Sequence, residues 1–295
     1  MKIKKTKSQR AFSIISYTLV LLMVVFCLFP LVLIVSGSFT QNDILMKHGY
    51  SLIPRQFSTA AYAQLFKYPQ GLITAYITTI AVTLIGTGIG LWIITMTGYV
   101  LQRPDFRYRR QVSFLIYFTT IFGGGMVPWF IMLSKYLHMQ NTYLSRIFPL
   151  LMSPFLIILM RTFISNTAPH EIVESAKIDG AGDFMIYWKI ILPIITPGLA
   201  TVGLFLALGY WNDWYLTSLF ITKKEMYSLQ YYLYDMINSV RFASEMGIPQ
   251  MGTEQLPTES LKMAMVVVVT GPIIFLYPFV QRYFVTGITI GSVKG

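Results

Sequence analysis

Long apolar runs dominate the pattern of hydrophobic and polar positions along the chain. Six of them approach or exceed about 20 residues, enough for a helix rising roughly 1.5 Å per residue to cross a bilayer. They cover residues 11–37, 71–101, 112–135, 145–165, 194–220 and 261–283. Glycine clusters inside them, such as Gly123-Gly124-Gly125, favour bends and close helix packing. The pattern predicts an all-α membrane protein with six transmembrane helices.

Basic residues set the expected orientation, because Lys and Arg favour the cytoplasmic ends of spans. With the N-terminus inside, 14 of them fall on the cytoplasmic side and 9 on the outer side. Both termini are therefore predicted to be cytoplasmic. The expected organisation is a basic N-terminus (1–10), a six-span domain (11–283) and a C-terminal tail (284–295). The first run is too long for a cleaved signal, so it is expected to be a retained span.

Composition agrees with this class of protein. Charged residues make up 12% of the 295 positions, against about 25% in soluble domains. The net charge is +11. The basic residues that produce it cluster at the ends of the apolar runs, which argues for a role in membrane topology rather than in nucleic-acid binding. Cys27 is the single cysteine, so no internal disulfide forms, and it is expected to be a small buried apolar residue.

The segment 166–193 is a polar island between the fourth and fifth runs. Thr167, Pro169 and Glu171 form a helix-start signal, with the threonine hydroxyl as the cap. Asp179-Gly180 is a turn signal, and Asp183 can cap a second short helix. The sequence predicts a helix–turn–helix whose first helix carries a small apolar stripe formed by Ile172, Val173 and Ala176. An interfacial pair that stabilises the bundle and a docking surface for a cytoplasmic partner both fit these residues.

The island resembles a known motif, the EAA loop of permease subunits in bacterial ATP-binding-cassette importers. The family pattern is Glu-Ala-Ala, three residues, Gly, nine residues, Ile-x-Leu-Pro. This chain has Glu174-Ser175-Ala176, then Gly180, then Ile190-x-Leu192-Pro193. Every spacing matches, and Ser175 is the one departure.

The resemblance implies that the loop forms short cytoplasmic coupling helices that dock on an ATPase subunit. Glu174 and Asp179 would make polar contacts with it, Ala176 and Gly180 would allow close approach, and Leu192-Pro193 would tie the loop to span five. The expected coupling residues are Glu171, Glu174, Ser175, Ala176, Asp179, Gly180, Gly182, Leu192 and Pro193.

A wider resemblance covers nearly the whole chain. It is similar to the second permease of maltose-type sugar importers, and segments such as Met160-Arg161-Thr162-Phe163 and Leu256-Pro257 resemble the oligosaccharide- and polysaccharide-uptake subgroup. This implies a bacterial inner-membrane protein that works with a second permease, two ATPase subunits, a solute-binding protein and an oligosaccharide. The tail residues implied to reach the ATPases are Gly291, Ser292, Val293, Lys294 and Gly295. By composition the tail is expected to be extended.

An aromatic and polar cluster is the candidate solute pathway, since sugars stack on rings and bond to amides and acids. Its residues are Trp211, Asn212, Asp213, Trp214 and Tyr215, with Trp129 as a further candidate. Asp213 is the one carboxylate inside a predicted span, where acids face a cavity or a partner. An aromatic belt at the outer interface is the alternative.

The chain carries no Gly-x-x-x-x-Gly-Lys phosphate loop, so ATP and magnesium are expected on partner subunits and no cofactor on this chain. No catalytic residues and no metal ligands are predicted, because the three histidines fall in loops without partners. An ion-coupled secondary transporter is the main alternative. It would normally show several ionisable groups within its spans, and a membrane enzyme would need a catalytic constellation at depth.

Overall fold

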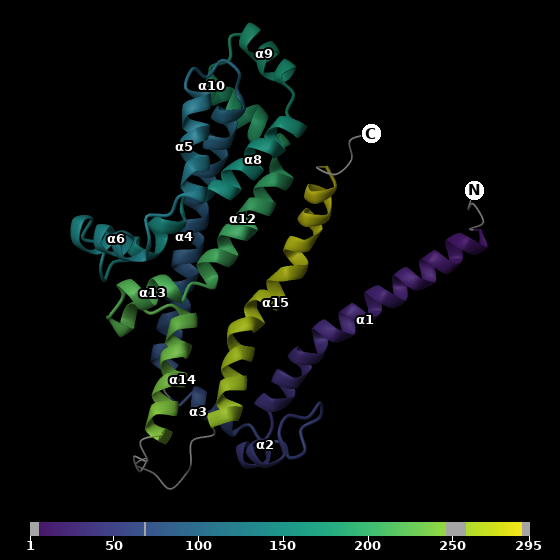
Figure 1. Cartoon of the computed structure of the whole chain (residues 1–295), viewed down its shortest axis with the longest axis vertical. Coiled ribbons are helices and arrows are strands. Elements are labelled where there is room, and N and C mark those ends of the chain that lie inside the picture. Colours follow the sequence, from purple (N-terminus) through teal and green to yellow (C-terminus); the bar gives the residue numbers. More distant parts are fainter. Residues whose placement is uncertain (1–5, 68, 246–257, 291–295) are drawn as a thin grey trace. The chain divides into compact units, whose positions relative to one another are not determined.

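Helices of very different lengths make up this computed structural model, which describes residues 6–67, 69–245 and 258–290 (Figure 1). Among these residues there is no strand, only one isolated antiparallel bridge between Thr40 and Phe57. The all-α prediction is therefore confirmed for the described part of the chain. The chain divides into two units, residues 1–69 with 236–272 and residues 70–235 with 273–295.

The first unit begins with a long apolar helix, α1 (Lys7–Ser38). Thr6 caps it reciprocally with Gln9, whose backbone N–H donates to Thr6 Oγ1 over 3.3 Å. Most side chains of α1 are exposed and apolar all round, as expected of a membrane helix. Cys27 lies among them, so the expectation that its side chain is buried was wrong.

The segment after α1 folds back onto the start of the last helix. It contains α2 (Asn42–His48) and α3 (Ala60–Leu65), and the last helix is α15 (Thr258–Ile290). Asn42 Oδ1 accepts the backbone N–H of Glu259 at 2.9 Å, satisfying a free donor of the first turn. α15 continues through Ile290, so residues 284–290 are helical and not extended; no proline interrupts the chain after Pro278. Residues 291–295 lie outside the described part.

The remaining helices lie in the second unit, except for residues 236–245 of α14, which belong to the first. They are α4 (Pro69–Gln102), α5 (Arg109–Ile121), α6 (Met126–Ile131), π-helix η1 (Met132–Tyr136), α7 (Leu144–Ile147), 3-10 helix η2 (Phe148–Leu150), α8 (Pro154–Thr167), α9 (His170–Ile178), α10 (Asp183–Met185), π-helix η3 (Ile186–Ile191), α11 (Leu192–Ile194), α12 (Thr196–Trp211), α13 (Tyr215–Phe220), 3-10 helix η4 (Lys224–Met226) and α14 (Leu229–Glu245).

Two of the predicted spans, 112–135 and 145–165, are sharply bent, and a third bend lies where the polar island meets the fifth span. The chain turns by 115° between α5 and α6, where Gly125 has a φ of +87°. It turns by 47° before α8 and by 84° between α11 and α12, where Pro154, Pro193 and Pro197 remove backbone donors. The bends expected from glycine and proline in the spans are present.

Two helices in the described part, α1 and α4, are individually long and apolar enough to cross a membrane. Counting each bent pair as one span raises the number to five. The sixth predicted run, 261–283, lies within α15.

The core of the second unit lies between α4, α8 and α12. α12 packs on α8, and buried aliphatic residues such as Ile94, Met160 and Leu206 fill the space between helices. Glycines permit the closest approaches. A Cβ on Gly86 of α4 would lie 2.5 Å from the ring of Tyr210 on α12. The Tyr210 hydroxyl donates to the carbonyl of Ile147 at 2.9 Å, fixing the ring against the helix.

Candidate functional site

The polar island folds as a helix–turn–helix, as the sequence predicted. α9 ends at Ile178, and Gly180 follows with a φ of +81°, a left-handed conformation that glycine adopts without steric cost. α10 then begins at Asp183 and passes directly into η3. These elements sit at one end of α4 and α5 (Figure 1).

Two details of the helix-start prediction were wrong. Thr167 does not cap α9, because α8 continues through it and its hydroxyl donates to the carbonyl of Phe163 at 2.8 Å. The N-cap position of α9 is Pro169, which has no side-chain acceptor. Asp183 is the first residue of α10 rather than its cap, which is Gly182. The carboxylate of Asp183 instead accepts a hydrogen bond from Arg103.

One face of α9 is anchored in the core. Val173 and Ala176 are buried in the same cluster as Ile164 and Tyr187. Ala176 therefore packs against the chain's own bundle and is not free for contact with a partner. Ile172, expected on the same stripe, is exposed.

The opposite face of the loop is exposed and mixes acidic and apolar side chains. Ile178 is 86% exposed, and the rings of Phe184 and Trp188 stack 6.3 Å apart on the surface. The other exposed residues of this face are Glu171, Glu174, Ser175, Asp179, Gly180, Gly182 and Met185. Of the last two predicted coupling residues, Leu192 is half-buried and Pro193 is exposed. Large apolar side chains held out on an anchored helix pair are typical of a protein interaction surface.

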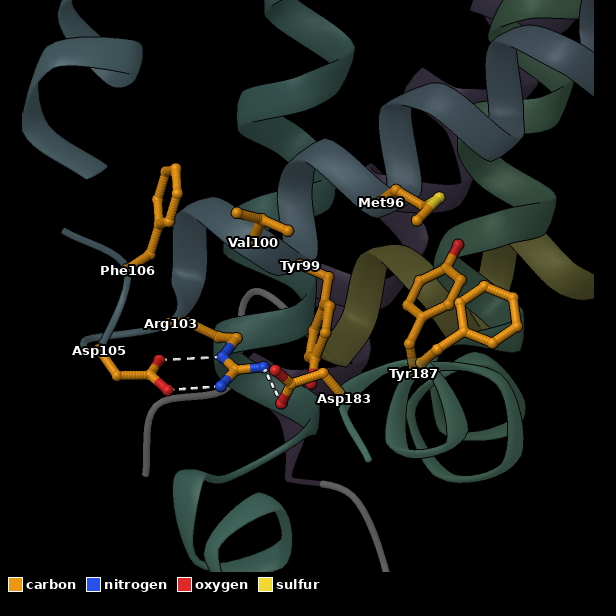
Figure 2. Close-up of a pocket in the computed structure, with 9 residues that line it drawn as sticks. Met96, Tyr99, Val100, Arg103, Asp105, Phe106, Asp183 and Tyr187 are labelled. Carbon is orange, nitrogen blue, oxygen red and sulfur yellow. Dashed lines mark hydrogen bonds and ion pairs between the residues drawn. The ribbon is translucent and has the colours of Figure 1, made fainter. Parts of the chain in front are cut away.

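A cluster of four charged residues joins this loop to the segment after α4; we call it the Arg103 cluster (Arg103, Asp105, Lys177 and Asp183). Arg103 pairs with Asp105 through Nε at 2.9 Å and through Nη2, while its Nη1 lies 2.5 Å from Asp183 (Figure 2). Lys177 of α9 donates to Asp105 at 2.8 Å. One guanidinium thus bridges carboxylates from two loops, which its rigid planar fork permits.

A pocket of about 460 Å³ adjoins the cluster. Its walls are Met96, Tyr99, Val100, Arg103, Asp105, Phe106, Asp183, Phe184 and Tyr187. The Arg103 guanidinium lies 5.7 Å from the Tyr99 ring, and the rings of Tyr99 and Tyr187 are 5.5 Å apart. The pocket therefore lies between α4 and the 166–193 loop, with aromatic walls and the Arg103 cluster at one side.

Hydrogen bonding sets the charge states of the cluster. The hydrogen bonds from Arg103, then from Lys177, hold the pKa of Asp105 well below its usual range. The bond to Asp105 raises the pKa of Arg103 above its ordinary value. Both groups are charged across the physiological range.

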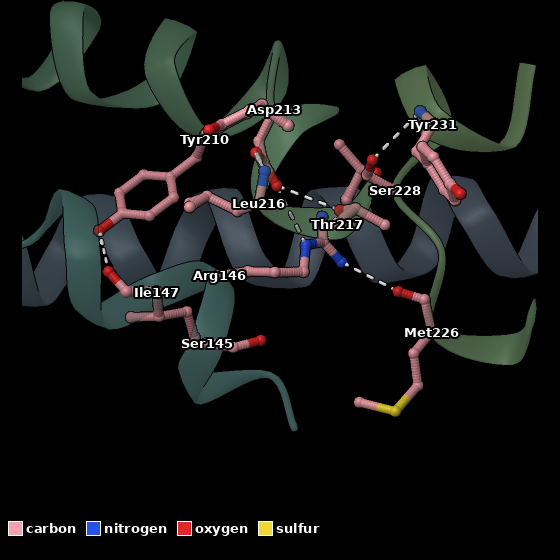
Figure 3. Close-up of polar contacts among 12 residues, drawn as sticks. Ser145, Arg146, Ile147, Tyr210, Asp213, Leu216, Thr217, Met226, Ser228 and Tyr231 are labelled. Carbon is pink, nitrogen blue, oxygen red and sulfur yellow. Dashed lines mark hydrogen bonds and ion pairs between the residues drawn. The ribbon is translucent and has the colours of Figure 1, made fainter. Parts of the chain in front are cut away.

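The candidate solute pathway contains a buried ion pair rather than a free acid. Arg146 Nε lies 3.4 Å from Asp213 Oδ2, and the two side chains are 0% and 5% exposed (Figure 3). Asp213 also accepts the Leu216 N–H at 2.9 Å and the Thr217 hydroxyl at 3.1 Å. Arg146 donates to the carbonyl of Met226 at 3.2 Å. The network joins α7, the break between α12 and α13, and η4.

The other predicted pathway residues do not converge on one cavity. Trp211 is buried, Asn212 accepts from Gln230 at 3.3 Å, and Trp129 packs edge-on to Phe220 at 5.3 Å. Trp214 and Tyr215 are exposed.

Sequence reasoning missed Arg103, Asp105, Lys177 and Arg146 as site residues. It used three of them only as charges that orient the chain. Three of the ion pairs join residues 67, 72 and 80 positions apart, which no local spacing reveals. One signal was available: a lone carboxylate in a span calls for a buried cation, and Arg146 is at the edge of another span. Among the described residues, no group of metal-ligating side chains forms a site.

Comparisons with known proteins identify the family. Residues 94–290 match the family described as "binding-protein-dependent transport system inner membrane component". The chain is 33% identical to the polygalacturonan/rhamnogalacturonan transport system permease protein YtcP of Bacillus subtilis, over 97% of this chain and 99% of that protein. It is 27% identical to the arabinooligosaccharides transport system permease protein AraQ of Halalkalibacterium halodurans, over 90% and 91%.

A solved structure is similar as well. It is a chain of a bacterial ABC transporter involved in the import of the acidic polysaccharide alginate, with a TM-score of 0.81 and 28% identity. The match covers 96% of this chain and 100% of that chain.

Proposed function

The chain belongs to the family of binding-protein-dependent transport system inner membrane components, the permease subunits of ATP-binding-cassette importers, and we propose that it moves oligosaccharides driven by an ATPase docked on the 166–193 loop. The observation that carries the docking proposal is the exposed face of this loop. Ile178, Phe184 and Trp188 project from a helix pair whose other face is fixed in the core. A fixed apolar surface can transmit force from a partner, whereas a mobile one would absorb it.

The proposed mechanism is alternating access. Binding of ATP to the partner subunits closes them, the docked loop moves, and the helices of this chain and a second permease open toward a loaded solute-binding protein. Hydrolysis reverses the change. Coupling of this kind requires contacts that differ between the two states.

The proposed topology has six spans with both termini in the cytoplasm, so that the 166–193 loop faces the ATPases. The support is the 14 to 9 distribution of Lys and Arg residues between the two sides. A cysteine placed at Ile178 in a Cys27→Ala background tests it. The thiol should react with an impermeant reagent only in inside-out vesicles, and reaction in right-side-out vesicles would contradict the topology.

Oligosaccharides rich in uronic acid are the proposed solutes. One relative is named for polygalacturonan and rhamnogalacturonan transport and the similar structure for alginate, both acidic, while another relative is named for arabinooligosaccharides. Asp213 is already neutralised by Arg146 and accepts two further hydrogen bonds. It therefore offers no free carboxylate for ion coupling, which favours the ATP-driven importer.

Co-purification tests ATPase docking. We expect Ile178→Ser and Glu174→Lys to lower recovery of the co-expressed ATPase with this chain. The control is Ile53→Ser, which removes an isoleucine 79% exposed in the segment between α2 and α3. Equal recovery from all three variants would refute docking at the 166–193 loop. Uptake of a polygalacturonan digest compared with arabinooligosaccharides then tests the solute class.

A further inference from the structure

The last two turns of α4 carry contacts to both arms of the coupling loop. Thr95 Oγ1 lies 2.7 Å from the hydroxyl of Tyr187, and Gln102 Nε2 lies 3.3 Å from His170 Nε2. Tyr99 packs on Tyr187, and Arg103 immediately after α4 pairs with Asp183. Residues spaced by three, four or eight positions share one side of a helix. One side of α4 therefore contacts the loop along its last two turns.

Of the residues on this side, Arg103 is the one that forms ion pairs with the loop and with Asp105. Its side chain is 11% exposed and makes charge-assisted hydrogen bonds to two carboxylates, Asp105 and Asp183, which are themselves 51% and 63% exposed. Asp183 begins the second arm of the loop, and Asp105 also binds Lys177 near the end of the first arm. Lys177 Nζ lies 3.8 Å from Asp183, so the cluster also ties the two arms together.

The other end of α4 contacts a different part of the second unit. The Thr79 hydroxyl accepts the backbone N–H of Leu229 at 2.8 Å, at the start of α14. A Cβ on Gly71 would meet the Tyr232 hydroxyl at 2.7 Å, so α14 also packs closely there. α4 is unbroken over 34 residues, a length of about 50 Å. It is the one unbent helix that reaches from the coupling loop to α14 among the described elements of this unit.

We propose that Arg103 is a positioning residue for energy coupling, which fastens the 166–193 loop to α4 so that displacement of the loop moves α4 and, through it, the start of α14. Without this attachment the loop still binds the ATPase, because its exposed face is unchanged and its other face stays packed in the core, but less of its displacement reaches α4. The inference rests on the proposed function, since it presumes that an ATPase moves the loop.

The test measures transport per ATP hydrolysed by the complete complex in proteoliposomes, with a polygalacturonan digest as the transported probe. The variants are Arg103→Gln, Asp183→Asn and the double substitution. Arg107→Gln is the matched control, since it removes the same charge from the same segment and its guanidinium contacts only the neighbouring Tyr108 in the described structure. ATPase recovery and hydrolysis are measured on the same samples.

We expect Arg103→Gln and Asp183→Asn to retain the bound ATPase and its hydrolysis but to lower uptake per ATP about tenfold, a typical coupling free energy. The double substitution should be no worse than the more severe single one, because both remove one interaction. Arg103→Lys should restore only part of the coupling, since one ammonium cannot reproduce the two-sided fork. Arg107→Gln should match the unaltered complex.

The outcomes separate the two proposals. Unchanged uptake per ATP in Arg103→Gln and Asp183→Asn overturns the inference and leaves the proposed function intact. Absence of the ATPase or of uptake with the unaltered chain overturns the proposed function itself. If Arg103→Gln fails to assemble, Asp183→Asn decides, because its carboxylate is 63% exposed and its loss leaves no buried charge unsolvated. Failure of both to assemble would make the Arg103 cluster purely structural and overturn the inference.

Discussion

Arg146 and Asp213 form an ion pair 3.4 Å apart between residues separated by 67 positions in the chain, and both side chains are buried. The carboxylate lies at the break where α12 gives way to α13, and the guanidinium comes from α7. The pair therefore defines how two bent spans meet. The Asp213 carboxylate is paired with a cation and accepts two further hydrogen bonds, so it is not a free acid.

Removing one partner of this pair should be much worse than removing both. Arg146→Met or Asp213→Leu alone leaves an uncompensated buried charge, which costs about 3–5 kcal/mol. The double substitution should recover a large part of that stability, since a well-packed apolar pair often replaces a buried ion pair at little cost. Thermal unfolding of the detergent-purified protein, followed by size-exclusion chromatography, measures this.

The control for the Arg146 variants is Arg161→Met, which removes an arginine from α8 that has no ion pair in the described structure. It should lower the unfolding temperature far less. Additive effects of the two substitutions at Arg146 and Asp213 would show that the two residues stabilise the fold independently.

The sequence predicted the features that depend on local chemistry. The apolar runs, the helix–turn–helix at 166–193 and its turn at Gly180 all follow from periodicity and backbone preference, and Gly180 has the expected positive φ. Thr167 shows the limit of such reasoning: its hydroxyl suits a cap, yet α8 extends over it because its packing continues through Ile164 and Ala168. Arg103 and Arg146 could not be placed, because each is defined by a partner brought near only by tertiary folding.

Two glycines on α4 provide a test of close packing. A methyl group at Gly86 would lie 2.5 Å from the Tyr210 ring, which its hydroxyl bond to Ile147 holds in place, so Gly86→Ala should destabilise by about 1–3 kcal/mol. Gly88→Ala meets open space within 4 Å and should be neutral or stabilising by up to about 1 kcal/mol, since alanine is the better helix former. The two unfolding temperatures should separate in that order, and equal values would show that α4 and α12 are not in close contact.

The turn of the 166–193 loop gives a second glycine pair. Gly180 has a φ of +81° with open space around it, so Gly180→Ala costs about 1–2 kcal/mol through backbone strain alone. Gly182 lies two residues away with a φ of −70°, so Gly182→Ala is free of that strain. ATPase recovery should fall for Gly180→Ala only. Loss of recovery in both variants would assign the effect to added bulk at the interface instead of turn geometry.

The Arg103 cluster should resist acid to an unusual degree. Asp105 accepts hydrogen bonds from Arg103 and Lys177, which hold its pKa below the ordinary value of 3.8. A carboxylate whose folded-state pKa is depressed contributes stability above its unfolded value, and this is lost only as pH falls through the folded value. Arg103, whose pKa is raised, stays protonated throughout. Lys177 and Asp183 are the other charged groups of the cluster. The link from Asp105 to Lys177 of the loop should therefore persist from pH 7 to below 3.8.

A spin label on a cysteine at Ile178, in the Cys27→Ala background, reports this attachment through its mobility. The spectrum should stay that of an immobilised loop until the pH falls below 3.8 and should recover on return to neutrality. Asp105→Asn should be more mobile at every pH, because the amide cannot hold both cations by charge. A transition centred at or above 3.8 in the unaltered cluster would mean that Arg103 and Lys177 do not hold Asp105 ionised in solution.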